Sequence, residues 1–429
     1  MQTSLKTTVA AILATTGLSG AVQAAPAGSE LDLGLTPVAG GMEGVGAARP
    51  RGNLGLVVGN PATITQLEGE TSFTVGGSWI SPDLNSEGTF SVPGPGGTLG
   101  GAPLDGRSDL DDLAMPHVAV AQRITDRLVV GMGVTGSSGL GSDFRDSFPV
   151  ALSLTADLKL FGATMTAGYQ VTDKLAVGVG FTLGIGSLQV GTIPSTSSSN
   201  NFGVGGRVGL TYDAGPLIFG ASYKTEIKIK YSKVVLVDPN TLSDFTLTQP
   251  RELRAGFSTS DSFSDKLMLS VEGSWKNYSN AAGYQDFWRN QWRIALGGQF
   301  DVNETWSLRA GWSYSRAISK PAEKLGNSLG EIRSLFAPGF PDLGLGPETA
   351  PVFPDIIQLT QSTIANGLWQ QGISGGLGVQ LTDRIRLDVN ASYGFDGKQD
   401  FVSPIPGSLQ RLSGDGSIFS TGMGVSWAF

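Results

Sequence analysis

The sequence predicts an all-β fold, a 14-stranded antiparallel transmembrane β-barrel. Three observations lead to this prediction. A tight polar turn followed by a strand recurs along the chain, apolar and small residues alternate strictly in those strands, and short connections contrast with long ones. The composition agrees, because 62 of the 429 residues are Gly and only 15% are charged. A soluble surface of this size normally carries more charge.

The recurring unit occurs five times, each copy with a polar turn such as Thr-Asp-Lys or Thr-Asp-Arg before a strand. The copies begin at Ile124, Val171, Phe263, Val302 and Leu381, and a sixth turn lies at Asp213-Ala214-Gly215. Asp and Asn side chains hydrogen-bond the local backbone and favour such turns. The six hairpins give twelve strands, and Glu70–Ile80 and Gly414–Phe429 bring the number to fourteen.

The alternation separates an apolar face of each strand from a small or polar face. Between Leu175 and Gly186, every odd position is apolar and every even position is Ala, Gly or Thr. Shifting a strand by one residue would turn its charges into lipid, at about 2–4 kcal/mol for an Arg near the midplane. The polar face is therefore expected to line the lumen. Five charged residues share that face: Glu272, Arg293, Arg309, Arg386 and Asp388.

The lengths of strands and connections indicate that lipid surrounds the apolar face. The strand segments run about 9 to 11 residues, the span of a tilted membrane strand. Connections are short at one end and long at the other, where they cover 81–113, 137–160, 231–247, 318–368 and 397–412. This asymmetry is typical of outer-membrane barrels, whose short turns are periplasmic. Tryptophans near strand ends suit interfacial girdles: Trp79, Trp275, Trp288, Trp292 and Trp369 by the long loops, Trp306 and Trp427 by the turns.

The N-terminal residues divide into two expected segments. Residues 1–24 are typical of a signal peptide, with Lys6, an apolar stretch from Val9 to Leu18 and the cleavage sequence Val22-Gln23-Ala24. Residues 25–69 are Gly-rich and irregular. They form either a disordered periplasmic tail or a plug in the lumen, ahead of the barrel at 70–429. A barrel of fourteen strands leaves a pore unless something fills it.

Charge and cysteine content exclude other classes of protein. The formal net charge of −8 argues against nucleic acid as a partner, since such proteins carry a basic surface. The chain has no Cys, so disulfides and thiolate metal sites are excluded. The acidic run Asp109, Asp111 and Asp112 is more simply a solvated loop than a Ca²⁺ site. We predict no metal and no cofactor.

Short blocks spread along the chain match a known family. The most specific is Asn60-Pro61-Ala62, and others are Gly44–Ala48, Thr125–Gly133, Ser138–Phe144, Trp292–Gly297 and the terminal Trp427-Ala428-Phe429. With these blocks the sequence resembles the FadL-type outer-membrane transporters of long-chain fatty acids and related hydrophobic compounds. The resemblance implies a barrel plugged by an N-terminal hatch. It also implies passive uptake of a hydrophobic ligand, which leaves sideways into the membrane at a kinked third strand.

The resemblance also implies where the functional residues lie. Asn60, Pro61 and Ala62 would lie in the hatch. Gly136, Ser137, Ser138 and Gly139 would lie at the lateral opening, where Gly and Ser interrupt the apolar alternation, as at bulges and bends. Leu140 and Phe144, in the same matching block, are candidate ligand contacts.

The sequence departs from the family in two places. The long loop between strands five and six is here only 188–200, and the long insertion is 318–368, where 328–336 could form an amphipathic helix. A basic residue expected near 184–190 is absent. Arg289 and Arg293 are the remaining candidates to bind a ligand carboxylate, which Arg can hold bidentately. The alternative for each is a lumen charge paired with Glu or Asp.

Other motifs carry weaker hypotheses. Gly372–Gly376 fits the sequence pattern of the nucleophile elbow, and Gly131–Gly136 fits that of the dinucleotide-binding loop. Both motifs need a helix directly after the strand, whereas these segments lie within alternating strands. His117 is the only histidine, and we expect it to be structural or to touch the ligand. We predict a monomer that contacts lipopolysaccharide and has no catalytic residues. The rival functions are a general diffusion porin and a barrel enzyme that acts on lipids through His117.

Overall fold

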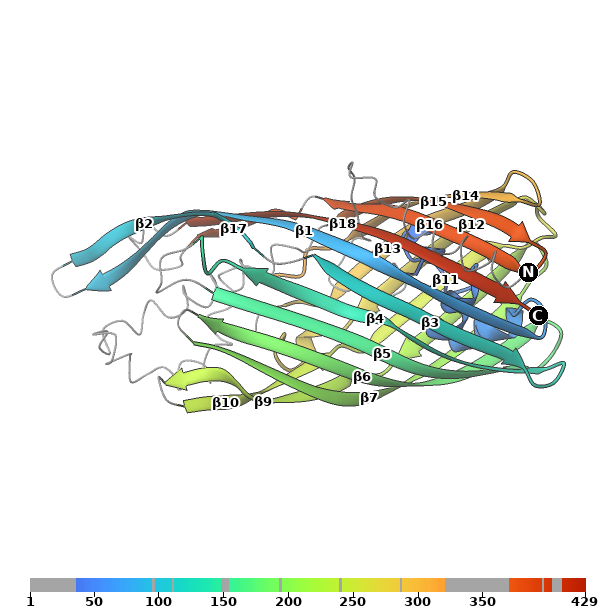
Figure 1. Cartoon of the computed structure of the whole chain (residues 1–429), viewed down its shortest axis with the longest axis horizontal. Helices are drawn as coiled ribbons and strands as arrows, with labels where there is room; N and C mark the ends of the chain where they lie inside the picture. The colour runs from blue at the N-terminus through green and yellow to red at the C-terminus, as the bar shows by residue number, and fades with distance from the viewer. Residues whose placement is uncertain are drawn as a thin grey trace, which may run out of the picture.

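The structure is a computed structural model, and it describes residues 36–94, 97–109, 112–147, 154–192, 195–238, 241–285, 288–320, 370–395, 397–402 and 411–429. Its main sheet has sixteen strands, of which β2 and β17 pair only beside the outer ends of β1 and β18. Sixteen minus two leaves fourteen strands, which close into a barrel because β18 pairs with β1. The predicted antiparallel 14-stranded barrel is confirmed (Figure 1).

The wall is built from strands of unequal length. Its strands are β1 (Thr71–Gly94), β3 (Leu113–Arg123), β4 (Leu128–Asp143), β5 (Leu154–Gln170), β6 (Leu175–Thr192), β7 (Ser195–Asp213), β8 (Leu217–Lys224), β11 (Glu252–Thr259), β12 (Leu267–Lys276), β13 (Gln291–Asp301), β14 (Trp306–Ser315), β15 (Gln371–Thr382), β16 (Ile385–Phe395) and β18 (Arg411–Ala428). The wall is therefore tall at β4–β7 and low at β8 and β11–β14.

Several segments expected as loops contain strands. β2 (Gly97–Arg107) forms a hairpin with the extended β1, which projects beyond the barrel (Figure 1). β9 (Ile227–Asp238) and β10 (Thr241–Gln249) form a separate hairpin, and β6 pairs with β7 up to Thr192 and Ser195. β17 (Gln399–Val402) pairs beside β18. The prediction of loops was wrong here because a strand outside lipid does not need one apolar face, so these strands need not show the alternation over a full membrane span.

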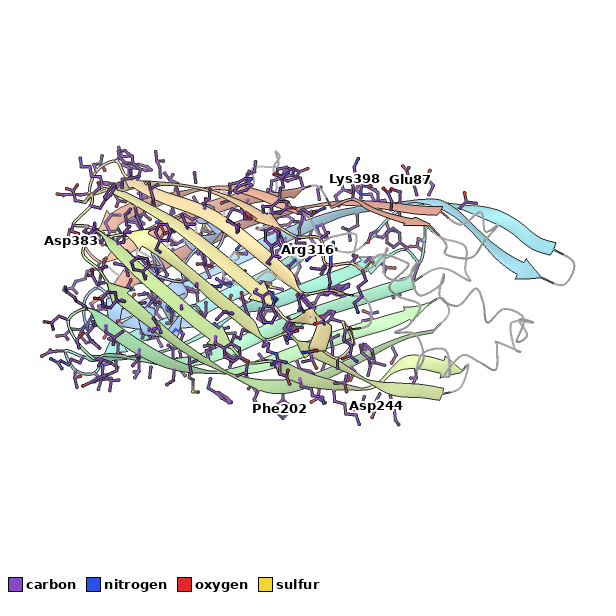
Figure 2. The ribbon with its side chains drawn as sticks, turned by 180° about the vertical axis from the view of Figure 1, so that it is seen from behind. Glu87, Phe202, Asp244, Arg316, Asp383 and Lys398 are labelled. Carbon is purple, nitrogen blue, oxygen red and sulfur yellow. The ribbon has the colours of Figure 1, made fainter. Side chains whose placement is uncertain are left out.

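The two faces of the wall follow the predicted register. Val179 is 59% exposed and Leu308 is 48% exposed, whereas their neighbours Gly178 and Ser307 are buried toward the lumen. Arg309 and Asp388 form a buried ion pair at 2.8 Å. Figure 2 shows Phe202 on the outside of the barrel. The labelled charges Asp383 and Glu87 lie at opposite ends (Figure 2). Among the described residues, no helix is long and apolar enough to cross a membrane.

The described part of the N-terminal segment, residues 36–67, lies inside the barrel. It contains η2 (Ala39–Met42), α2 (Asn53–Val58) and η3 (Pro61–Gln66), the blue helices near the C-terminus in Figure 1. Apolar side chains of α2 and η3 form a buried cluster with residues of β3 and β4. The signal-peptide prediction for 1–24 and the start of the predicted plug lie outside the described residues.

Candidate functional site

Asn60 fixes the N-terminal segment against the wall. Its amide nitrogen donates to the carbonyl oxygens of Ala47, at 2.6 Å, and of Leu210 in β7, at 3.0 Å. Its side-chain oxygen accepts from the backbone N–H of Ala62 at 3.1 Å and so caps η3, where Pro61 stands in the first turn. Asn60, Pro61 and Ala62 are therefore placed at a buried junction between the segment and the barrel.

Glycines on the lumen face let this junction come close to the wall. A Cβ at Gly178 of β6 would overlap the backbone of Pro61, and one at Gly209 of β7 would overlap the side chain of Asn60. A Cβ at Gly220 of β8 would overlap Ala47. Only Gly permits so close an approach of two backbones. The small residues on the lumen face of these strands thus allow the N-terminal segment to pack closely against the wall.

Charged lumen side chains hold the same segment through its backbone. Glu272 of β12 accepts from the backbone N–H groups of Gly46, at 2.8 Å, and Ala47, at 2.7 Å. Arg207 of β7 donates to the carbonyl oxygen of Val58. Such charge-assisted bonds are stronger than neutral ones. They connect the segment to two strands of the wall, β12 and β7.

Arg293 and Arg289 occupy different environments. Arg293 donates to the carbonyl oxygen of Glu43 and lies 3.8 Å from its carboxylate, so it contacts the N-terminal segment. Arg289 lies in the loop after β12 and donates to the carbonyl oxygen of Ala317 at 2.7 Å. Burial and the nearby charge of Arg316 lower the pKa of Arg289. Ligand binding by either residue stays a prediction. The ion pair of Arg293 with Glu43 corresponds to the alternative given above, a lumen charge paired with an acidic residue.

The wall has a break between β3 and β4. β3 pairs with β1 up to Leu113, but it pairs with β4 only up to Val118, which lies opposite Val134. β4 continues to Asp143 along β5, with a register shift between Gly136 and Ser138. Ser137 is thus the extra residue of a bulge. Residues 113–117 therefore face residues 135–142 without ladder pairs. We call this stretch the window.

Side chains fill the window. The ring of His117 lies between two hydroxyl groups, with Nδ1 2.9 Å from Thr135 Oγ1 and Nε2 2.9 Å from Ser78 Oγ. The sulfur of Met115 occupies the space that a Cβ on Gly136 would need. Met115 also packs against Ile80 and Ile418 in a buried cluster. The window is therefore closed by side chains in place of backbone hydrogen bonds.

The predicted lateral-opening residues lie at this window or beside it. Gly136 and Ser137 are buried at the bulge, and Ser138 and Gly139 follow in β4. Leu140 is paired with Leu158, but its side chain lies outside the described part of the structure. Phe144, just past the end of β4, is fully buried. At the outer end of the window, Asp143 is hydrogen-bonded to Ser108 and Asp109.

Comparison with known proteins identifies the architecture. Residues 18–241, more than half of the chain, match the family described as outer membrane protein transport protein (OMPP1/FadL/TodX). The chain belongs to this family. It is 22% identical over 343 residues to outer membrane protein P1 of Haemophilus influenzae, which covers 64% of this chain and 74% of that protein.

Solved structures share the fold of the family. A Pseudomonas aeruginosa FadL homologue superposes with a TM-score of 0.67 and 16% identity, over 94% of this chain and 100% of that one. The P. putida toluene transporter TodX gives 0.63 and 14%, over 92% and 99%. The Ralstonia pickettii toluene transporter TbuX gives 0.61 and 18%, also over 92% and 99%. The protein is thus an outer-membrane transport protein of the FadL/TodX family.

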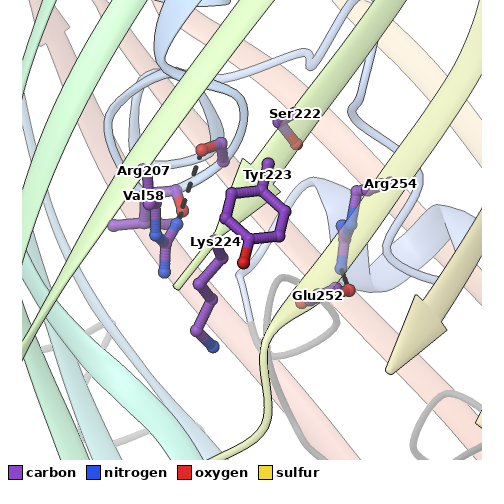
Figure 3. A pocket seen from close by; sticks show the side chains of 8 residues that line it. Val58, Arg207, Ser222, Tyr223, Lys224, Glu252 and Arg254 are labelled. Carbon is purple, nitrogen blue, oxygen red and sulfur yellow. Dashed lines mark hydrogen bonds and ion pairs between the residues drawn. The ribbon is translucent and has the colours of Figure 1, made fainter. Parts of the chain in front are cut away.

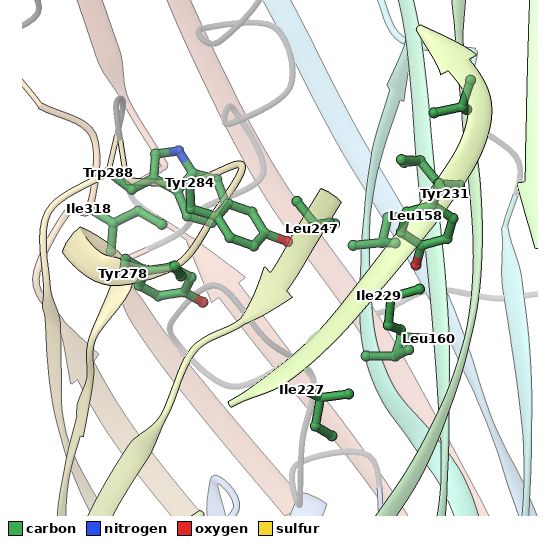
Figure 4. Packing of buried hydrophobic residues seen from close by; sticks show 13 residues of the cluster. Leu158, Leu160, Ile227, Ile229, Tyr231, Leu247, Tyr278, Tyr284, Trp288 and Ile318 are labelled. Carbon is green, nitrogen blue, oxygen red and sulfur yellow. The ribbon is translucent and has the colours of Figure 1, made fainter. Parts of the chain in front are cut away.

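An apolar cluster lies on the lumen side of the tall wall, above the N-terminal segment. Figure 4 shows Ile227 and Ile229 of β9 beside Leu160 of β5, with Trp288 and its aromatic neighbours across from them. A Cβ at Gly186 or Gly203 would meet side chains or backbone of β9, so this hairpin lies against the inner face of β6 and β7. The sequence analysis missed this cluster: it placed residues 231–247 in a long connection and Trp288 in the interfacial girdle.

Trp288 corrects the predicted girdle. It is only 4% exposed and stacks on Tyr284, with ring centroids 4.5 Å apart, while Tyr278 meets it edge-on at 5.0 Å. Trp79, Trp275, Trp292 and Trp306 are exposed as predicted, and Trp369 lies outside the described residues. Proximity to a strand end could not distinguish a tryptophan that faces lipid from one that folds inward.

The remaining motif residues are structural in this fold. Ser374, the central residue of the nucleophile-elbow match, accepts from the backbone N–H of Glu43 at 2.9 Å. Gly131, in the dinucleotide-loop match, faces Ile64 and Val57 of the N-terminal segment. At His117, Thr135 stands where a Ser-His-Asp triad has its acid, and a hydroxyl cannot stabilise an imidazolium as a carboxylate does. Of the acidic run, Asp111 lies outside the described residues.

Proposed function

We propose that the protein takes up hydrophobic small molecules passively across the outer membrane, with long-chain fatty acids as one class of cargo. The N-terminal segment acts as a hatch that prevents free diffusion through the lumen, and cargo leaves sideways through the window. The observation that carries this proposal is the window itself, because a break in the hydrogen-bonded wall beside lipid gives a hydrophobic molecule an exit that avoids water.

The chemistry of the window supports a lateral exit. Backbone groups in lipid must be satisfied, so a barrel wall is normally a continuous ladder. Between β3 and β4, the closure consists of Met115, an unbranched side chain that adapts its shape easily, and of two hydrogen bonds at His117. Side chains can rotate away without unfolding a strand, so the wall can open here at lower cost than elsewhere.

The N-terminal segment inside the lumen supports its role as a hatch and disfavours a general diffusion porin, which would lack a folded plug. Contacts of Asn60 and Arg207 hold the hatch to β7, and contacts of Glu272 hold it to β12. Membership of a transport family disfavours a lipid-acting enzyme. TodX and TbuX are named as toluene transporters, which is consistent with hydrophobic cargo. A monomeric state and contact with lipopolysaccharide stay predictions.

A reversible cross-link tests the exit route. The chain has no Cys, so Met115→Cys combined with Gly136→Cys introduces the only two thiols. The close approach of the Met115 side chain to Gly136 brings a disulfide within reach. Uptake of a radiolabelled fatty acid into cells that depend on the variant should stop after oxidation and return after reduction.

The matched control places the same cross-link just outside the window. Val118 and Val134 are directly paired across β3 and β4, so Val118→Cys with Val134→Cys joins strands that are already joined by the ladder. This pair should transport equally well when oxidised and when reduced. Continued uptake by the oxidised window pair would show that cargo leaves by another route.

A further inference from the structure

The tall part of the wall, β4–β7, has a second edge without ladder pairs. β7 pairs with β6 from Ser195 to Tyr212, but with β8 only from Arg207 onward. Among the strands that the structure describes, none pairs with residues 195–206 on the side of β8, and we call this stretch the β7 break. One row of directly paired residues runs from the window to the β7 break: Gly136, Phe161, Ile185 and Phe202. The tall wall is therefore interrupted at both of its edges.

The lower rim of the β7 break has free space beside it. There Arg207 of β7 lies opposite Lys224 of β8, which in turn lies opposite Glu252 of β11, and β8 and β11 end at this row. A cavity with about 330 Å³ of empty space, part of it open to solvent, lies between these strands and Gly59 of the hatch (Figure 3). Tyr223, whose side chain is 37% exposed, also lines it. The wall thus has unfilled space where the ladder between β7 and β8 stops.

Apolar side chains place the β7 break beside lipid. Phe202 and Val204 project outward from the unpaired stretch and are 64% and 53% exposed, and Figure 2 shows Phe202 on the outside of the barrel. The backbone N–H of Phe202 donates to the side-chain oxygen of Asn201 at 2.9 Å, a local bond that takes the place of a ladder bond. Open sheet edges are not found exposed to hydrocarbon. The β7 break therefore needs a cover.

β9 covers the β7 break from inside the barrel. Ile227 and Ile229 lie against the lumen face of β7 at Gly203 and Gly205, and both side chains are only 1% exposed. They belong to the apolar cluster of the lumen, where Figure 4 shows them beside Leu160 of β5. The β7 break thus has apolar side chains on its lipid side and on its lumen side.

Side-chain hydrogen bonds fasten β9 to β7. Three side chains of β7 bond to the backbone of β9: Ser197 donates to the carbonyl oxygen of Lys233 at 2.7 Å, Asn201 donates to that of Lys230 at 2.7 Å, and Ser199 accepts from the N–H of Ser232 at 3.0 Å. Within the described strands, β9 has ladder pairs with β10 alone. Separate side-chain bonds can be released locally. β9 can therefore leave the β7 break without unfolding the wall.

We propose that the β7 break is a second lateral opening, through which uncharged hydrophobic molecules enter the lumen cluster directly from the surrounding membrane when β9 moves aside. The inference rests on the proposed function and adds a route of entry to it. Phe202 and Val204 flank this route outside, and Ile227 and Ile229 line it inside. Such a path suits a molecule without charge, because an ion would lose its hydration there without gaining a partner.

A reversible cross-link tests whether β9 must move. A Cβ on Gly205 would lie 2.7 Å from Cγ1 of Ile227, so Gly205→Cys with Ile227→Cys brings two thiols within reach of a disulfide in a chain that has no Cys. Cells that depend on this variant should take up radiolabelled hexadecane when the thiols are reduced and lose the uptake on oxidation. The matched control, Leu183→Cys with Val204→Cys, joins directly paired residues of β6 and β7 and should transport equally in both states.

A lipid-anchored photoprobe distinguishes entry from the membrane from entry through the mouth of the barrel. Phosphatidylcholine with a diazirine on its acyl chain stays in the bilayer, so in vesicles of this lipid it should label Phe202 always and Ile229 only when the β7 break opens. Asn201→Ala loses its hydrogen bond to β9 and should raise the labelling of Ile229 roughly two- to tenfold, the value of one hydrogen bond. Asn200→Ala, at the exposed neighbour, should leave the labelling unchanged.

The outcomes separate this inference from the proposed function. Equal hexadecane uptake by the oxidised and reduced Gly205–Ile227 pair would overturn the inference. It also fails if Ile229 is never labelled, in the wild type or in Asn201→Ala, because β9 would then move for cargo that enters by the mouth. In both cases the proposed function stands as long as oxidation of the Met115–Gly136 pair stops fatty acid uptake. Uptake of either cargo that is equally fast in cells without the protein counts against the proposed function as well.

Discussion

Replacing Glu272 by Ala should release the hatch while the barrel stays folded. The carboxylate accepts two backbone hydrogen bonds, from Gly46 and Ala47, and it is almost fully buried. Each hydrogen bond to a charged group contributes about 1.5–3 kcal/mol, so the two together stabilise the docked hatch by about 3–6 kcal/mol. At about 1.4 kcal/mol per factor of ten, the ratio of open to closed hatch should rise roughly a hundred- to ten-thousandfold.

Limited proteolysis and conductance report this change. Arg51 is the trypsin site of the described hatch, since Arg49 is followed by Pro50, and the Arg51 side chain is largely covered in the closed barrel. Glu272→Ala should be cut after Arg51 and should conduct in a planar bilayer, whereas the wild type should resist and stay silent. Glu272→Gln should be intermediate, since its amide oxygen can still accept a hydrogen bond.

Asp388→Ala is the matched control for Glu272. Asp388 is another buried lumen carboxylate, but its ion pairs are with Arg309 and Arg386, both in the wall. Its loss should lower the thermal stability of the barrel without exposing the hatch to trypsin. A folded Glu272→Ala barrel that remains silent and resistant would refute the idea that this carboxylate holds the hatch.

Three further predictions concern the packing of the wall and of the β9–β10 hairpin. Gly209→Ala should lower stability by about 1–3 kcal/mol, as overpacking does, because its Cβ would overlap Asn60, whereas Gly206→Ala has room and should unfold like the wild type. Val179→Arg should cost up to about 2–4 kcal/mol in unfolding from lipid vesicles if the apolar face meets acyl chains, and wild-type stability would contradict that placement. Burial raises the pKa of Tyr231 to about 12 from 10.0, so its contribution should be lost as pH rises from 10 to 12. Tyr231→Phe should not show that loss, and an identical alkaline transition in both proteins would count against the burial.

The alternation of residues made the wall predictable. In β6 the odd residues from Val177 to Ile185 face outward and the even ones face the lumen, because lipid and lumen impose opposite requirements on neighbouring positions. The constraint acts only where a strand crosses lipid. The sequence Ile227-Lys-Ile-Lys-Tyr231 also alternates, but nothing local indicates that its apolar face packs on other strands.

The site was predictable only in part. The Asn60-Pro61-Ala62 block indicated a hatch through resemblance, yet its partner in the wall, Leu210, is 150 positions away from Asn60 in the chain. The row of Arg207, Lys224 and Glu252 depends on the register of three strands, which the sequence alone does not fix to the residue. Arg293 was expected at the lumen and lies there, but its neighbour Glu43 comes from a segment without periodicity.

The way the hatch is held follows from the chemistry of a closed barrel. Backbone N–H and C=O groups of the wall are used in the ladder, so they offer few partners to a segment inside. The hatch is therefore bound by separate side chains, such as Glu272 and Arg207, and by close packing on glycines. Separate contacts can be released locally, whereas a ladder opens only as a unit, and elements that move are drawn from the less stable parts of a protein. The window follows the same rule, because the wall there depends on His117 and Met115 in place of backbone pairs. Both movable elements of the proposed transport cycle thus lie where side chains have replaced the ladder.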